Sequence, residues 1–149
     1  MMTRTLALLT AMLIPLTLSA EQTLAQEERP LSVRRAMAKA EEDMKTPQAS
    51  ASRQCAADFA FAFDWSGFAD DDLKQKRAAS YCEAAFSALR QVCYDDLGSE
   101  AVRSRVEGLV CGFSENRLVS LEEGVLRFDL NFTDSNNQDF VRAFLEDAL

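Results

Sequence analysis

The sequence predicts a small α+β domain, in which an antiparallel sheet of about four strands packs against a long central helix and a C-terminal helix. Apolar residues recur at helical spacing between Ala78 and Leu97. They alternate with polar residues in several shorter stretches, as in strands. The chain has 149 residues, is 48% hydrophobic and contains four cysteines, so one core tied by two disulfides is expected.

The first 25 residues are expected to form a secretory signal peptide. Arg4 precedes an apolar run from Leu6 to Leu18, which is too short for a stable membrane anchor. Cleavage after Ala20 lies closer to the end of this run, whereas cleavage after Ala25 follows the small-residue rule better. Both sites remain open. The expected localisation is periplasmic or secreted, with no transmembrane anchor after processing.

Residues 26–52 are expected to form a charged N-terminal arm, which precedes a single disulfide-stabilised domain at 53–149. Between Pro30 and Pro47, a narrow apolar stripe predicts one short helix. Either this arm is solvated, or its helix docks on the core or on a partner. The stripe consists of Val33, Ala36, Met37, Ala40 and Met44.

The first strand of the domain is predicted by an aromatic row with a period of two. The row consists of Phe59, Phe61, Phe63 and Trp65. Alternation points all four side chains to one side of a strand, although the alanines between them also permit a helix. Such a row is typical of core beneath a helix, and a ligand-binding platform is the weaker interpretation.

The central helix is expected to begin near Asp71 and to stop at Leu97, because Gly98 accepts the left-handed conformation that follows many helices. It carries Cys82 and Cys93, which are 11 positions apart. In an unbroken helix these two cysteines are about 16 Å apart. A disulfide needs Cα atoms within about 7 Å, so they cannot bond to each other.

Two disulfides are expected, because an exported chain with four cysteines meets an oxidising environment. If the first strand runs up and the central helix runs back down, Cys55 at the strand start lies near Cys93 at the helix end. Cys82 then lies partway along the helix, where Cys111 can reach it. The preferred pairing is Cys55 with Cys93 and Cys82 with Cys111.

The remaining elements complete the order β-α-β-β-β-α, with three antiparallel strands in sequence. Residues 99–111 are predicted to be a strand rather than a helix, because of Gly108 and the β-branched residues. A hairpin is expected around a turn at residues 122–124. Ser135 or Asn136 can cap the C-terminal helix.

The chemistry of the chain is limited by its composition. It has no histidine, so a Ser-His or Cys-His pair is impossible within it, and no glycine-rich phosphate loop or other cofactor motif is present. Asp64, Asp70 and Asp72 are weak candidates for acid-base catalysis or for a calcium site. Clusters of this kind are more often helix caps.

Charge and export indicate the class of partner. The net charge is −8, which argues against a nucleic-acid partner and suits a basic envelope or secreted protein. The leading hypothesis is a non-enzymatic interaction or inhibitor-type domain in the cell envelope. The alternatives are a carboxylate-based hydrolase of envelope glycans and a small-ligand carrier lined by the aromatic row.

Overall fold

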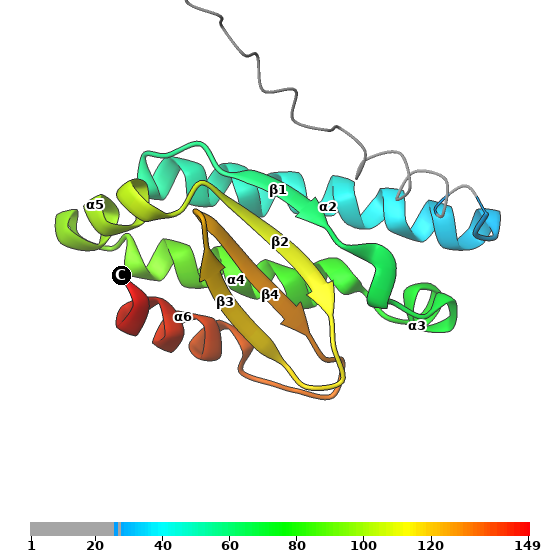
Figure 1. The fold of residues 1–149 in the computed structure, drawn as a ribbon. Coiled ribbons are helices and arrows are strands. Elements are labelled where there is room, and N and C mark those ends of the chain that lie inside the picture. The colour runs from blue at the N-terminus through cyan, green and yellow to red at the C-terminus, as the bar shows by residue number, and fades with distance from the viewer. Residues whose placement is uncertain (1–25, 27) are drawn as a thin grey trace, which may run out of the picture.

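The computed structural model describes Gln26 and residues 28–149, so the expected signal peptide at residues 1–25 lies outside the described residues. The fold is α+β, as predicted. A four-stranded sheet covers a layer of three helices, α2 (Leu31–Cys55), α4 (Ala78–Val92) and α6 (Asn137–Ala148). Figure 1 shows these helices behind the sheet, with α4 between the other two.

Helix α2 is much longer than the short helix predicted before Pro47, and it continues through this proline to Cys55. Proline inside a helix costs about 3 kcal/mol, because it removes one hydrogen bond and its ring crowds the preceding turn. Burial on both sides of Pro47 offsets this cost, because fully burying a methionine side chain contributes about 1.5–3 kcal/mol and burying one methylene-sized group contributes about 0.8 kcal/mol. Met44 before the proline and Ala51 after it are both fully buried. Helix α2 therefore packs against the core along one side.

The first strand, β1 (Ala60–Phe63), lies where the aromatic period of two predicts it. A single 3-10 turn, η1 (Trp65–Gly67), leads from β1 to the next helix. The predicted central helix is divided into α3 (Asp70–Gln75) and α4, because Lys76 has extended backbone between them. Leu73 before this break and Ala78 after it are both buried, so each of the two helices packs an apolar side against the core.

The prediction of a strand over residues 99–111 is wrong for its first half, which is helix α5 (Asp96–Arg105). Val102 and Val106 are both buried. They are four positions apart, a spacing that fits one turn of a helix as well as the alternation of a strand. Gly98 does not end the preceding helix. It lies in the first turn of α5, where a Cβ atom would collide with the carbonyl oxygen of Val92.

The sheet is mixed, which corrects the antiparallel arrangement predicted from the sequence. Its order is β1-β2-β4-β3, with β2 (Gly108–Phe113), β3 (Leu118–Glu122) and β4 (Val125–Leu130). β1, β2 and β4 are parallel, and only β3 runs antiparallel to β4. Three helices connect β1 to β2 and permit the parallel pairing. After β2, the chain forms β3 at the edge of the sheet and then returns as β4, which lies between β2 and β3.

The β3–β4 hairpin and α6 agree with the sequence. The hairpin turns at Glu123 and Gly124, which both have positive φ, as the twist of a two-residue hairpin requires. Asn136 takes the N-cap position of α6 with positive φ, but its side chain makes no capping hydrogen bond. Val141 and Leu145 are fully buried on the inner side of α6.

Two disulfides connect α4 to its neighbours. Cys55 at the end of α2 is bonded to Cys93 just past α4, with Cα atoms 5.1 Å apart. Cys82 in α4 is bonded to Cys111 in β2, with Cα atoms 6.1 Å apart. This is the pairing that the sequence favours. Both bridges are buried, so the helix layer is tied to itself and to the sheet.

Replacing Cys82 and Cys111 together by alanine removes the bond between α4 and β2, whose loop spans 29 positions. The chain-entropy relation, which is model-dependent, assigns about 4 kcal/mol to such a bridge. We expect the free energy of unfolding to fall by about this amount in urea denaturation. Unchanged urea midpoints in the wild type and the double variant would contradict the expected stabilisation.

Candidate functional site

The aromatic row predicted as core or as a ligand platform lies in the core. Phe59, Phe63 and Trp65 are buried, and Phe63 stacks on Trp65 with ring centroids 4.1 Å apart. Phe61 packs 5.5 Å from Phe86 of α4. The indole Nε1 of Trp65 donates a 3.1 Å hydrogen bond to Glu41. These rings therefore join β1 to the helices and do not line an open surface.

Asp64, the first of the three candidate carboxylates, follows β1 and takes part in an ion-pair network. Its Oδ1 accepts hydrogen bonds from the backbone and the hydroxyl of Ser66, at 3.1 and 2.6 Å. Its Oδ2 lies 2.8 Å from Nη2 of Arg127. Arg127 also donates a 3.0 Å hydrogen bond from Nε to Asp129. The guanidinium group lies above Gly112, where a Cβ atom would collide with Asp129.

The electrostatics of this network keep Asp64 ionised. Burial alone would raise the pKa of its carboxyl group, but the hydrogen bonds from Ser66 and Arg127 and the charge of Arg127 outweigh burial and lower the pKa. Hydrogen bonds to Asp129 and Asp64 raise the pKa of the Arg127 guanidinium group. A catalytic acid needs a pKa close to the working pH, and the shift of Asp64 goes the other way.

The other two candidates, Asp70 and Asp72, do not join Asp64 in one site. Asp70 forms a 3.1 Å ion pair with Arg29. Asp72 lines a separate shallow hollow beside Phe113 and Phe132. Among the described residues, no group of three or more histidine, cysteine or acidic side chains lies close enough to hold a metal ion.

A different candidate site lies where α4 passes into α5, at residues 94–97, of which the last two begin α5; we call it the Tyr94–Leu97 corner. Tyr94 is 88% exposed and Leu97 is 77% exposed. No other large apolar side chain of the described residues is as exposed as either. Asp95 and Asp96 lie between them and are also exposed. The corner thus presents two apolar side chains beside two carboxylates.

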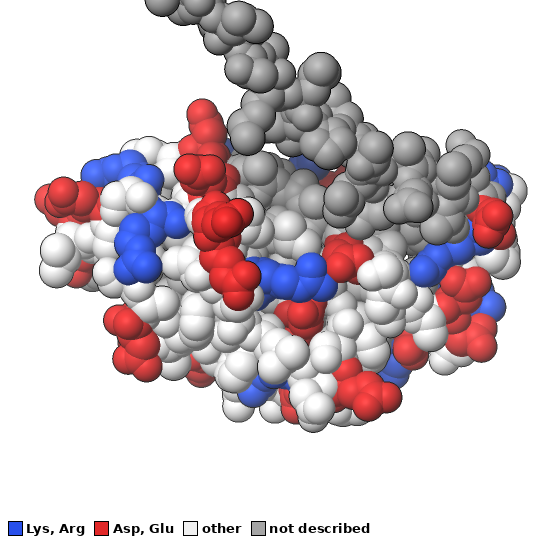
Figure 2. All heavy atoms as spheres, viewed as in Figure 1, with Lys and Arg blue, Asp and Glu red and all other residues white. Residues whose placement is uncertain are grey.

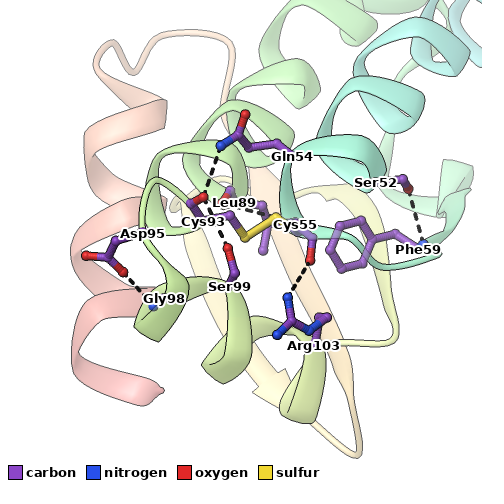
Figure 3. The surroundings of a disulfide bond; sticks show 10 residues. All are labelled: Ser52, Gln54, Cys55, Phe59, Leu89, Cys93, Asp95, Gly98, Ser99 and Arg103. Carbon is purple, nitrogen blue, oxygen red and sulfur yellow. Dashed lines mark hydrogen bonds between the residues drawn. A yellow bond between two sulfur atoms is a disulfide. The ribbon is translucent and has the colours of Figure 1, made fainter.

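The backbone around this corner is held in place from three elements (Figure 3). The Cys55–Cys93 disulfide fixes the residue that precedes Tyr94. The carbonyl oxygen of Cys93 accepts hydrogen bonds from Gln54 Nε2 at 3.0 Å and from Ser99 Oγ at 3.2 Å. The side chain of Arg103 donates to the carbonyl oxygen of Cys55 at 3.4 Å.

The start of α5 is fixed as well. The carboxylate of Asp95 caps this helix by accepting a 2.8 Å hydrogen bond from the backbone N–H of Gly98, as Figure 3 shows. The N–H of Ser99 donates to the carbonyl oxygen of Asp95 at 3.0 Å. The backbone of the corner is therefore ordered before any partner arrives, while the side chains of Tyr94 and Leu97 extend into solvent.

Sequence reasoning missed this corner, because it placed Leu97 and Gly98 at the end of the central helix. One signal was present. Tyr94 follows the last residue of the predicted apolar stripe, Cys93, and is followed by Asp95 and Asp96. An aromatic residue followed by two acidic residues at a helix end is a poor core segment, and it indicates exposure.

Comparisons with known proteins found no match: no protein-family model matches the chain, and neither curated proteins nor solved structures gave a significant similarity. Function is therefore inferred from the site itself. None of the helices in the described part of the chain combines the length and the hydropathy that a bilayer crossing requires.

The lowered pKa of Asp64 predicts a specific loss of stability in acid. The stabilisation from its carboxylate is complete above the unfolded-state pKa near 3.8 and is lost as the pH falls through the lower folded-state pKa. We expect Asp64→Asn to lower the free energy of unfolding at pH 7 by about 1 kcal/mol. The difference from wild type should shrink at pH 2–3, in urea denaturation.

Asp147→Asn is the matched control, because Asp147 is an exposed carboxylate of α6 and the substitution makes the same change of charge. This control should unfold like the wild type at both pH values. An Asp64→Asn effect that is equal at pH 7 and pH 2 would contradict the ion pair with Arg127.

Proposed function

We propose that this protein is an exported, non-enzymatic interaction domain of the inhibitor type, which binds a basic envelope or secreted protein through the Tyr94–Leu97 corner. The observation that carries the proposal is the exposure of Tyr94 and Leu97 on a backbone fixed by the Cys55–Cys93 disulfide. Contiguous exposed apolar patches mark interaction sites, and the corner concentrates the two most exposed large apolar side chains of the described residues within four positions.

Export is supported by covalent chemistry. Both disulfides are compatible with an oxidising compartment, where such bonds form and persist. The signal peptide expected at residues 1–25 is consistent with transport to the periplasm or the extracellular medium.

The energetics of binding favour a rigid corner. A loop that is already ordered loses little conformational freedom on binding, so more of the contact energy is retained as affinity. Burying an apolar side chain contributes about 1.5–3 kcal/mol, and tyrosine is enriched among the residues that dominate interfaces. Tyr94 is therefore the expected anchor, with Leu97 beside it.

The charge of the corner defines the chemistry of the partner. Asp95 and Asp96 would lie at the rim of an interface centred on Tyr94, where lysine or arginine side chains can pair with them. The net charge of −8 would increase the association rate with a basic protein and oppose binding to an acidic one. The partner surface is accordingly an apolar pocket rimmed by basic residues.

The two alternatives have less support. A carboxylate hydrolase needs two carboxyl groups of different pKa at one site, whereas Asp64 and Asp70 are each paired with an arginine. A carrier lined by the aromatic row needs an apolar cavity, whereas Phe63 and Trp65 are packed in the core. No described feature favours either alternative over the corner.

Affinity capture from the native envelope and the medium tests the proposed function. We expect the wild-type protein to retain one protein in stoichiometric amount, and the double variant Tyr94→Ala, Leu97→Ala to retain at least tenfold less, since the pair is expected to supply about 1.4 kcal/mol or more. Leu31→Ala is the matched control, because Leu31 is 52% exposed on a different helix.

The control variant should retain the partner like the wild type. Equal recovery with the double variant would exclude the corner as the binding site. Repeated captures that return only background would remove the support for an interaction domain altogether.

A further inference from the structure

The sheet has one face that α2, α4 and α6 do not cover. Cys111 is bonded to α4, and Phe128 is fully buried, so these residues of β2 and β4 point toward the helices. Their neighbours Val110, Gly112 and Arg127 therefore point to the opposite side. Ala60 and Ala62 of β1 lie on the same side and are exposed. We call this side the open sheet face.

The parallel strands of the sheet are normally covered on both sides. β1, β2 and β4 are parallel, although β3 makes the sheet mixed, and purely parallel sheets have helices on both faces. In the described residues, helices cover one face alone (Figure 1). The architecture therefore leaves space where a second helical layer is normally found.

The floor of the open sheet face is built from small residues. Gly108, Val110 and Gly112 line β2, and Ala60 and Ala62 line β1. The Arg127 and Asp129 side chains lie over Gly112. The small residues Ala60, Ala62, Gly108 and Val110 form the rest of the floor, where the backbone of a docked helix can approach closely. The four strands are about 4.8 Å apart and about 13 to 20 Å long, so they form a face that fits a single helix of three to four turns.

The charge of this face determines whether it attracts a basic or an acidic ligand. Arg127 is held between Asp64 and Asp129, so its charge is more than neutralised. The side chain of Glu107 lies against Gly124, at the turn that also carries Glu122 and Glu123. Figure 2 shows acidic side chains in a band along one side of this face, beside a basic group near its middle.

We infer that the open sheet face binds a basic amphipathic helix of a partner protein. Small apolar residues of that helix pack on the floor of β1 and β2, and its lysine or arginine side chains pair with the acidic band at the β3–β4 turn. A second copy of this chain fits poorly, because its net charge is also −8. This surface and the Tyr94–Leu97 corner are formed by different residues, so the inference does not depend on the proposed function.

A synthetic helical peptide tests the inference directly. The peptide has 14 residues, with alanine along one side and lysine along the other, and is titrated into the protein purified from cells that express the full chain. We expect saturable binding of about micromolar strength, because the face is smaller than a standard protein interface. The same peptide with glutamate in place of lysine should not bind.

Two variants locate the binding site. Ala62→Lys adds a positive charge on the open sheet face, and Gln91→Lys makes the same change on the exposed side of α4. We expect about tenfold or greater loss of peptide affinity for the first variant and less than threefold for the second. Val125→Lys, at a β4 position that is 39% exposed, should behave like Ala62→Lys and provides a second test if that variant does not fold.

Three results would overturn the inference. One is a peptide that does not bind at all. Another is an equal loss of affinity in the Ala62→Lys and Gln91→Lys variants, which would mean attraction by net charge alone. The third is a wild-type dimer that Ala62→Lys dissociates, which would show that a second copy of the chain occupies the face.

Discussion

The Cys55–Cys93 disulfide joins three elements at one point, because Cys55 ends α2, Cys93 follows α4, and the first turn of α5 begins three residues later. The carbonyl oxygen of Cys93 accepts hydrogen bonds from α2 and from α5, so the bond and its surroundings set the angle between these helices. The second bridge fixes α4 to the sheet. Both proposed binding surfaces depend on these two disulfides. The Tyr94–Leu97 corner directly follows Cys93, and the open sheet face belongs to the sheet that is bonded to α4.

Part of this architecture could be predicted from the sequence, because the spacing of apolar residues in some segments matches the strand or helix that they form. The period of two between Phe59 and Trp65 predicted β1, and the helical spacing in residues 78–93 predicted α4. Reach excluded a bond between Cys82 and Cys93, which lie too far apart on one helix, and the expected up-and-down course of the first strand and the central helix then selected the pairing. These inferences used constraints that act within one element or between two neighbouring elements.

The rest depends on contacts between distant parts of the chain. Pro47 is a local stop signal, yet burial of α2 on both sides of it decides the outcome. Val102 and Val106 fit either a strand or a helix, and the cap by Asp95 together with the core contacts selects the helix. The entry of β4 between β2 and β3 leaves no periodic signal. For the same reason, the exposure of Tyr94 and the placement of Arg127 beside Asp64 appear only in the folded chain.

If the Cys55–Cys93 disulfide orders the Tyr94–Leu97 corner before any partner binds, the backbone N–H groups at the start of α5 are protected from exchange with solvent. Amide hydrogen exchange at Ser99 measures this protection, because this buried residue donates its N–H to the carbonyl oxygen of Asp95. In the oxidised protein, the account predicts exchange at least about a hundredfold slower than in an unstructured chain. In the Cys55→Ala, Cys93→Ala variant, most of that protection should be lost. Exchange at the unstructured rate in the oxidised protein would contradict a preordered corner.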